Sequence, residues 1–348
     1  MNNIIEQLAY AWPRLNASAQ WRCRPEDFQV FEDIGFEADG SGEHVLLQIQ
    51  KHNANTEWVS RKLARFADVP MRDVSYAGLK DRFAITTQWF SVRLAGKANP
   101  DWTLFNDEET RVLQWNLHTR KLKRGSLKAN RFTVVLRELH GDHVELVQRL
   151  ELIAAQGVPN YFTEQRFGRD GQNIEMARQM LLENRRFKDR HKRGLYLSAA
   201  RSLLFNLVLS QRVKDASWNR ILPGENVLLS GSRSHFIAEQ IDETIEQRLL
   251  DWDIQPSGPL AGQDNRVQQT VAYETEQACL ADYQDWCAGL IKAGLKAERR
   301  ALRSRVMDLS WEFPASDQLV LQFTLDKGCY ANGVIRELLD ASIPVTQS

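Results

Sequence analysis

Ser75-Tyr76-Ala77-Gly78-Leu79-Lys80-Asp81-Arg82 is the stretch around which the rest of this chain is organised. It places one acid, Asp81, between two bases, just after a glycine turn and ahead of an expected strand. Lys80 and Arg82 favour the ionised carboxylate, which can then act as a nucleophile or as a general base. The same residues also fit an ordinary exposed turn, because aspartate beside glycine is common in turns. Spacing alone therefore leaves both interpretations of Asp81 open.

The composition is typical of a globular protein with more than one domain. With 348 residues and 43% hydrophobic content, the chain is long enough for two cores. No apolar run approaches the roughly 18 residues of a membrane helix, and no basic-then-apolar leader opens the chain. Four scattered cysteines predict no disulfide framework, and His140 and His143 flank a turn, so we expect no metal site. We expect a cytoplasmic protein without a membrane span.

The charges balance overall but are unevenly distributed. Lys plus Arg equals Asp plus Glu at 45 each, so net charge indicates no polyanionic partner. From Asn116 to Arg137 there is no acid, while a second basic cluster, 185–193, holds only one, Asp189. The first run contains seven bases: Arg120, Lys121, Lys123, Arg124, Lys128, Arg131 and Arg137. Each basic run by itself fits an ordinary solvent-exposed face. Two such runs in a chain without net charge favour a surface that binds successive phosphates of a nucleic acid.

Hydrophobic periodicity predicts a mixture of strands and helices. Alternating apolar residues predict strands at 45–50, 88–94, 112–117, 132–137 and 319–325. The first of these strands is expected to be half-buried. Helices are predicted to begin at polar caps, at Asn55 or Thr56, at Asp142 and at Ser198. Gly157-Val158-Pro159 is a candidate domain boundary, and Pro256 to Gly262 is expected to form a rigid loop.

Several motifs along nearly the whole chain resemble those of the TruD family of tRNA pseudouridine synthases. Ala77-Gly78-Leu79-Lys80-Asp81 resembles the family's Gly-x-Lys-Asp motif, in which the aspartate is catalytic. Further matches are Pro25-Glu26-Asp27-Phe28, Asn130-Arg131-Phe132, Leu197 to Ser202 and Gly328 to Leu338. The most specific match is Asn160-Tyr161-Phe162-Thr163-Glu164-Gln165-Arg166-Phe167-Gly168. Two positions depart from the family: Arg22 stands where a lysine is typical, and Ala129 replaces a glycine.

The resemblance implies roles for particular residues. Asp81 would be catalytic, and Arg22 would pair with it and keep it ionised. The residues expected to bind the substrate base are Phe28, Lys80, Asn130, Phe132 and Tyr330, with the rings enclosing the uracil and Asn130 orienting it. The expected RNA-binding surface consists of Arg120, Lys121, Lys123, Arg124 and Lys128.

The resemblance also implies the fold, which is of the α+β class. A pseudouridine synthase core with a mostly antiparallel sheet would be built from both ends of the chain, residues 1–158 and 304–348. Residues 159–303 would form a helix-rich α+β insertion domain particular to the family. A cleft between the two domains, lined by the basic runs, would hold folded RNA.

The implied reaction isomerises uridine-13 of tRNA to pseudouridine. The N-glycosidic bond breaks, and the freed uracil turns and is rejoined through carbon, so the base must first be flipped out of its stack. Asp81 would attack the sugar, attack the base or take a proton from the sugar, and the sequence does not choose among these. No step needs an oxidant, a phosphate donor or a metal, so we expect no cofactor. The expected partner is tRNA, and no obligate protein partner is evident.

Two other classes of function remain open from the residues. A non-catalytic RNA-binding protein would need the basic runs and the aromatic residues but not Asp81. A glycosidase with paired carboxylates would need a second placed acid, for which Glu26, Asp27 and Glu32 are candidates.

Overall fold

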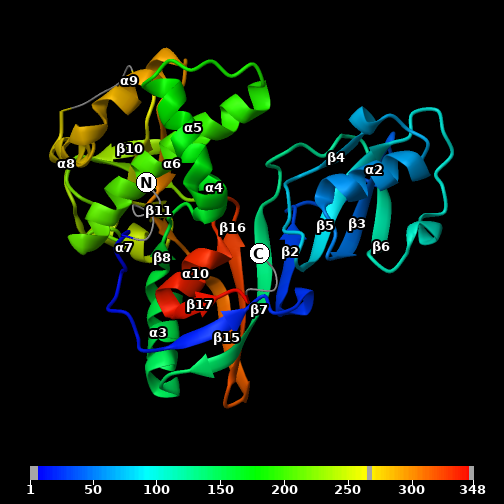
Figure 1. Ribbon diagram of the computed structural model, residues 1–348, viewed down its shortest axis with the longest axis horizontal. Coiled ribbons are helices and arrows are strands. Elements are labelled where there is room, and N and C mark those ends of the chain that lie inside the picture. Colours follow the sequence, from blue (N-terminus) through cyan, green and yellow to red (C-terminus); the bar gives the residue numbers. More distant parts are fainter. Residues whose placement is uncertain (1–6, 265–268, 345–348) are drawn as a thin grey trace. The chain divides into compact units, whose positions relative to one another are not determined.

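The computed structural model describes residues 7–264 and 269–344, and the chain forms two compact units (Figure 1). We call residues 15–154, 306–331 and 338–344 the sheet unit. We call the remaining described residues, 7–14, 155–264, 269–305 and 332–337, the helical unit. The division into a core of residues 1–158 and 304–348 and an insertion domain of residues 159–303 stays a prediction.

One large sheet forms the centre of the sheet unit. Its strands are β1 (Ser18–Trp21), β2 (Phe28–Asp33), β3 (His44–His52), β4 (Val74–Tyr76), β5 (Ile85–Arg93), β6 (Thr110–His118), β7 (Ala129–His140), β15 (Met307–Ala315), β16 (Gln318–Asp326) and β17 (Asp340–Ser342). The central order is β15-β16-β7-β2-β5-β3-β6, with β4 beside β5 and with β1 between β7 and β17. Pairing is antiparallel except at β2–β5 and β1–β17. The predicted mostly antiparallel sheet and all five predicted strands are confirmed.

The sheet unit also carries short and long helices. These are η1 (Pro25–Asp27), α2 (Thr56–Phe66), η2 (Met71–Asp73), η3 (Trp102–Phe105) and α3 (His143–Gln156). The predicted caps of the two long helices are confirmed, since Asn55 accepts from the Glu57 N–H and Asp142 from the Val144 N–H. α3 ends before Gly157, whose φ of 73° and close approach to the Ser304 carbonyl leave no room for a side chain.

Helix α2 covers one face of β3 and β5 (Figure 1). Val59 and Leu63 of the helix pack in one cluster with Leu47 of β3. The opposite face of β3 is covered too, because Leu46 packs there with Leu122. The expectation of a half-buried β3 is therefore wrong. A second layer, contributed by residues distant in the sequence, buries the face that the alternation marked as exposed.

A row of phenylalanine rings crosses three neighbouring strands. Phe132 of β7 stands opposite Phe323 of β16 in the register, with ring centroids 5.4 Å apart. On its other side the Phe132 ring lies 5.9 Å from that of Phe28 on β2. The Phe132 side chain is only 6% exposed. These rings therefore belong to the core of the sheet unit in this structure.

The helical unit surrounds one long helix with short strands and helices. Its elements are β8 (Val158–Pro159), α4 (Glu164–Phe167), η4 (Arg169–Gly171), α5 (Gln172–Leu181), α6 (Arg190–Lys214), β9 (Glu225–Leu229), β10 (His235–Ala238), α7 (Glu243–Leu250), β11 (Ile254–Gln255), β12 (Ser257–Leu260), α8 (Val271–Cys279), η5 (Ala281–Tyr283), α9 (Gln284–Lys292), β13 (Glu298–Ala301), β14 (Arg303–Ser304) and most of α10 (Ala331–Leu338). The strands form the groups β10-β9-β11, β12-β13 and β14-β8. The described residues contain no helix with the length and apolar character that crossing a lipid bilayer requires.

Two local predictions for the helical unit are wrong. Helix α6 does not begin at Ser198 but at Arg190, where the Asp189 side chain accepts from the His191 and Lys192 N–H groups. Its first turns are exposed and basic, so apolar periodicity marks only its later part. The expected loop at 256–262 contains strand β12, paired with β13. Pro259 is tolerated there because β12 has only one partner strand and its other edge needs no donor.

We predict that Phe132→Ala lowers the free energy of unfolding by about 3–5 kcal/mol, because the ring fills the space between Phe28 and Phe323. Urea unfolding of the purified variant measures the loss. Phe36→Ala is the matched control, since Phe36 is exposed and its truncation should cost less than about 1 kcal/mol. A loss for Phe132→Ala no larger than the control's would remove this ring from the core.

Candidate active site

The turn that carries Asp81 connects β4 to β5, and buried side chains from three elements hold its backbone. The Lys51 ammonium of β3 donates to the Asp81 carbonyl oxygen at 2.8 Å. The Thr56 hydroxyl, at the start of α2, accepts from the Lys80 N–H at 3.1 Å. The Gln88 amide of β5 donates to the Gly78 carbonyl. Three backbone groups of the turn are thus bound by side chains rather than left to solvent.

These anchoring side chains also bind one another. The Thr56 hydroxyl donates to the Gln88 amide oxygen at 3.0 Å, and both residues are buried. A connected and satisfied polar network inside a protein is rigid, because each lost bond would leave a desolvated group without a partner. The network therefore fixes where the turn presents Asp81.

The sequence analysis missed the anchoring role of all three residues, of which Lys51 is the charged one. Its side chain is fully buried, and its ammonium also donates to the Ala54 carbonyl at 2.7 Å. Burial lowers the pKa of Lys51 to about 8, although the nearby Asp81 charge acts in the opposite direction. A signal was present in the sequence, since Lys51 is in phase with the core residues Val45, Leu47 and Ile49.

Arg22 and Asp81 lie together, 59 residues apart in the sequence. The Arg22 Nη2 atom is 3.2 Å from Asp81 Oδ2. The Asp81 side chain is 32% exposed, while that of Arg22 is largely buried. The carboxylate is therefore held in an ion pair and remains open to a ligand on one side.

The Arg22 guanidinium is held against aromatic rings. It lies 4.0 Å from the centroid of the Phe28 ring and 4.6 Å from that of Trp21. Burial lowers the pKa of Arg22, while the Asp81 charge opposes that shift. Its backbone has a φ of 56°, a left-handed conformation that costs a non-glycine residue about 1–3 kcal/mol. Such strain at a site is retained when the surrounding structure specifies the geometry.

Lys80 is directed to a buried acid rather than to open space. Its ammonium lies 3.1 Å from Glu32 Oε1, and both side chains are buried. The other carboxylate oxygen of Glu32 accepts from the Trp89 N–H at 3.1 Å. Burial raises the pKa of Glu32, against the effects of Lys80 and of this backbone donor. The expected contact between Lys80 and the substrate base stays a prediction.

The acids considered for a glycosidase pair all have basic partners. Asp27 is buried and binds the Arg137 guanidinium with both oxygens, at 2.8 to 3.0 Å. Glu26 binds His52 at 2.8 Å, and Glu32 binds Lys80. A general acid must reach the leaving group, and the two buried acids do not reach solvent. This arrangement gives no support to a carboxylate-pair glycosidase.

The remaining predicted base-binding residues lie at one end of the sheet. Asn130 is half-buried on β7, and its side-chain oxygen is buried without a hydrogen-bond partner in the described part of the chain. Strand β16 ends at Asp326, which pairs with Ala129, and the segment leading to half-buried Tyr330 begins there. Asn130 and the start of the Tyr330 segment are thus brought to the same end of the sheet.

The predicted RNA-binding residues lie in the loop between β6 and β7, which we call the basic loop (residues 119–128). Their side chains are exposed: Arg120, Lys121, Lys123, Arg124 and Lys128. Lys121 donates to the Arg72 carbonyl at 2.6 Å, and Arg124 to the Tyr76 hydroxyl at 3.0 Å. The two partners are a carbonyl and a hydroxyl rather than carboxylates, so Lys121 and Arg124 keep their positive charge for an anionic ligand. The second basic cluster, 185–193, is exposed at the start of α6 in the helical unit.

Comparison with known proteins gives consistent matches over the whole length. The family model described as tRNA pseudouridine synthase D (TruD) matches residues 5–189 and 187–338. A tRNA pseudouridine synthase D of Nitrosococcus oceani is 48% identical over 342 residues, which cover 98% of this chain and 96% of the relative. That of Methylococcus capsulatus is 46% identical, covering 97% and 95%. The crystal structure of a protein described as tRNA pseudouridine synthase D from Methanosarcina mazei matches with a TM-score of 0.70 at 20% identity, covering 97% of this chain and 98% of that one, and shares the fold.

We predict that Lys51 makes the stability of the folded chain rise with pH above about 8. Burial depresses its pKa from 10.5 to about 8, so the unfolded chain keeps the proton to higher pH than the folded one. The unfavourable contribution is fully present below pH 8 and disappears as pH rises toward 10.5. Relative to Lys51→Met, the wild type should gain about 2 kcal/mol in free energy of unfolding between pH 8 and pH 10.

Urea unfolding at both pH values measures this difference. Lys123→Met is the control, since that lysine is exposed and its variant should follow the wild-type pH dependence. Parallel curves for the wild type and Lys51→Met would contradict a pKa depressed by burial.

Proposed function

This chain belongs to the TruD family of tRNA pseudouridine synthases, and we propose that it converts uridine-13 of tRNA to pseudouridine with Asp81 as the catalytic carboxylate. As a tRNA pseudouridine synthase it is an isomerase. The position of the uridine and the role of Asp81 are the parts that we propose. The main support for a catalytic role of Asp81 is its ion pair with Arg22, in which Asp81 stays partly exposed on an anchored turn.

The proposed reaction is balanced without a co-reactant. The bond from C1′ to N1 breaks, the bond from C1′ to C5 forms, C5 loses its proton and N1 gains one. A carboxylate can promote this by attacking C1′, by attacking C6 or by removing a proton from the sugar. Each of these roles uses the carboxylate, which the Arg22 guanidinium binds at 3.2 Å.

The uracil would be held at the end of the sheet beside Asp81. The buried side-chain oxygen of Asn130, which has no hydrogen-bond partner among the described residues, would accept the uracil N3–H. Phe28 is buried against the guanidinium that pairs with Asp81, so its ring would support the base site from behind Arg22. Phe132 adjoins Phe28, and Tyr330 would cover the base from the segment after β16.

The rest of the tRNA would be bound through its phosphates. The exposed lysine and arginine side chains of the basic loop supply positive charge but no geometry that selects a particular nucleobase. Such a surface suits recognition of the tRNA by its shape. A tRNA substrate would place the activity in the cytoplasm. The uridine must leave its stack to reach Asp81, so we propose base flipping as the first step.

We predict that Asp81→Asn abolishes turnover while tRNA affinity changes little. The amide is nearly isosteric but cannot act as nucleophile or base, and phosphate contacts supply most of the affinity. Single-turnover assays beside filter binding measure both quantities. Glu37→Gln, which removes an exposed acid elsewhere in the sheet unit, should keep both. Turnover of Asp81→Asn above about a thousandth of wild type would rule out the catalytic assignment.

We also predict that the product maps to position 13. Bulk tRNA and a tRNA transcript with uridine at position 13 are incubated with the protein, with no cofactor added. Carbodiimide adducts that survive mild alkali, which mark pseudouridine, are then mapped. A transcript carrying cytidine at position 13 is the control and should show no adduct. An adduct at another position in the wild-type transcript would overturn the site assignment but not the activity.

A further inference from the structure

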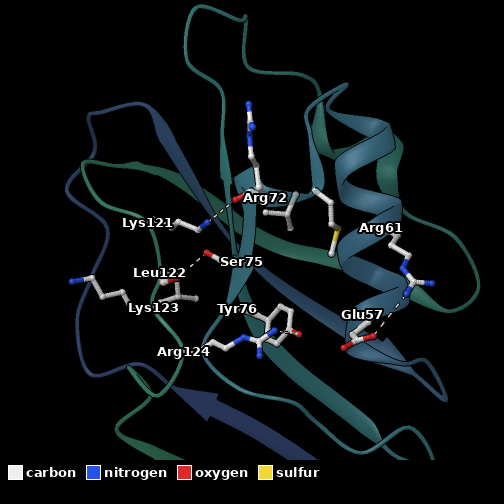
Figure 2. A pocket seen from close by; sticks show the side chains of 11 residues that line it. Glu57, Arg61, Arg72, Ser75, Tyr76, Lys121, Leu122, Lys123 and Arg124 are labelled. Carbon is white, nitrogen blue, oxygen red and sulfur yellow. Dashed lines mark hydrogen bonds and ion pairs between the residues drawn. The ribbon is translucent and has the colours of Figure 1, made fainter. Parts of the chain in front are cut away.

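A pocket of about 660 Å³ lies between α2, β4 and the basic loop in the sheet unit (Figure 2). Helix α2 contributes Arg61 and Glu57 to its wall. The segment that runs from η2 into β4 contributes Met71, Arg72 and Tyr76. The basic loop contributes residues 121–124. Neither Arg61 nor Arg72 was among the residues expected to bind RNA.

The lining is strongly basic. Among the described residues it holds five bases and one acid: Arg61, Arg72, Lys121, Lys123 and Arg124, with Glu57. Figure 2 shows Arg61 reaching along α2 to Glu57, but the two groups are 3.9 Å apart and both are exposed. Such a surface pair contributes little and leaves Arg61 available to a better partner. The pocket is therefore suited to an anion with more than one charge or to successive phosphates.

The pocket also has an apolar wall. Met71 is 43% exposed at its edge, and Val74 and Leu122 are buried behind the surface. The Arg124 guanidinium lies 5.1 Å from the centre of the Tyr76 ring and donates to its hydroxyl (Figure 2). A phosphate alone needs neither this volume nor an apolar surface. A nucleotide needs both, because its base binds by stacking on apolar, aromatic or guanidinium groups.

The floor of the pocket is continuous with the turn that carries Asp81. Tyr76 is the last residue of β4, and the turn begins at the next residue, Ala77. The Ala77 carbonyl accepts from the Gly125 N–H of the basic loop at 2.6 Å. Ala77 and Leu122 also pack in one buried cluster. A ligand in the pocket would thus contact both the basic loop and the strand that leads to the catalytic turn.

We propose that this pocket docks a second nucleotide of the tRNA substrate, distinct from the uridine that reacts. Its phosphates lie against the basic side chains and its base against Met71. The inference rests on the proposed function for the identity of the RNA. It adds a second point at which the enzyme binds the tRNA, next to the turn that carries Asp81.

The charge of the pocket is tested by filter binding of tRNA over a range of salt concentrations. The double variant Arg61→Gln/Lys123→Gln should raise the Kd roughly tenfold and reduce the salt slope by about 1 to 2. Arg65→Gln/Arg111→Gln is the matched control, because these arginines are exposed, lie on α2 and β6, and are outside the pocket. Equal losses in the two double variants would show unspecific charge and overturn the proposal.

The docking of a base is tested separately with Met71→Ala. This variant should weaken tRNA binding about threefold or more with an unchanged salt slope, because it removes a stacking surface and no charge. Leu104→Ala, which truncates an exposed apolar residue of η3, should bind like the wild type. If Met71→Ala binds tRNA with wild-type affinity, the pocket contacts phosphates alone, and the docking of a base is overturned. Uridine or adenosine monophosphate binding as tightly as tRNA would assign it to a free nucleotide instead.

These measurements do not depend on catalysis. If the wild type leaves uridine-13 unmodified but the pocket variants lose tRNA affinity selectively, the proposed function fails and the pocket stands. If uridine-13 is modified and the pocket variants bind like their controls, the pocket fails and the proposed function stands.

Discussion

The buried polar network around the Asp81 turn is the constraint on which the site depends. Lys51, Thr56 and Gln88 come from three elements of the sheet unit and bind three backbone groups of one short turn. The positions of these three side chains are set by strand register and by the start of α2. The backbone of the turn is therefore held in a fixed position relative to the sheet. A loop would otherwise be the least ordered place for the side chain of a candidate site.

This arrangement buries charged side chains, although removing a charge from water is unfavourable. Lys51 is buried against carbonyl oxygens, and Glu32 is buried against Lys80. Buried charged groups of this kind add little net stability, since desolvation offsets most of the attraction, but removing one partner is strongly destabilising. We infer that their effect is to exclude other arrangements of the turn. The charged groups around Asp81 are thus better understood as positioning devices than as sources of stability.

Arginine at position 22 suits its surroundings in a way that the family's usual lysine would not. Its flat guanidinium lies against the Phe28 and Trp21 rings and still reaches Asp81. An ammonium would keep the charge but lose the planar contact. The pocket beside β4 has a similar arrangement, with the Arg124 guanidinium beside the Tyr76 ring. Both sites combine positive charge with a flat apolar surface, a combination that suits the RNA binding proposed for them.

The sequence by itself determined the family and most of the sheet, and it supplied the candidate site as a prediction. Motif matches singled out Asp81 and Arg22, and alternation located five strands, because both signals lie within a few consecutive residues. Tertiary structure alone decided that β3 is buried on both faces, that Lys51 binds the Asp81 carbonyl and that Lys80 turns to Glu32. It also decided which bases share a pocket. These features depend on which distant segment covers a given side chain, and local periodicity carries no information about that partner.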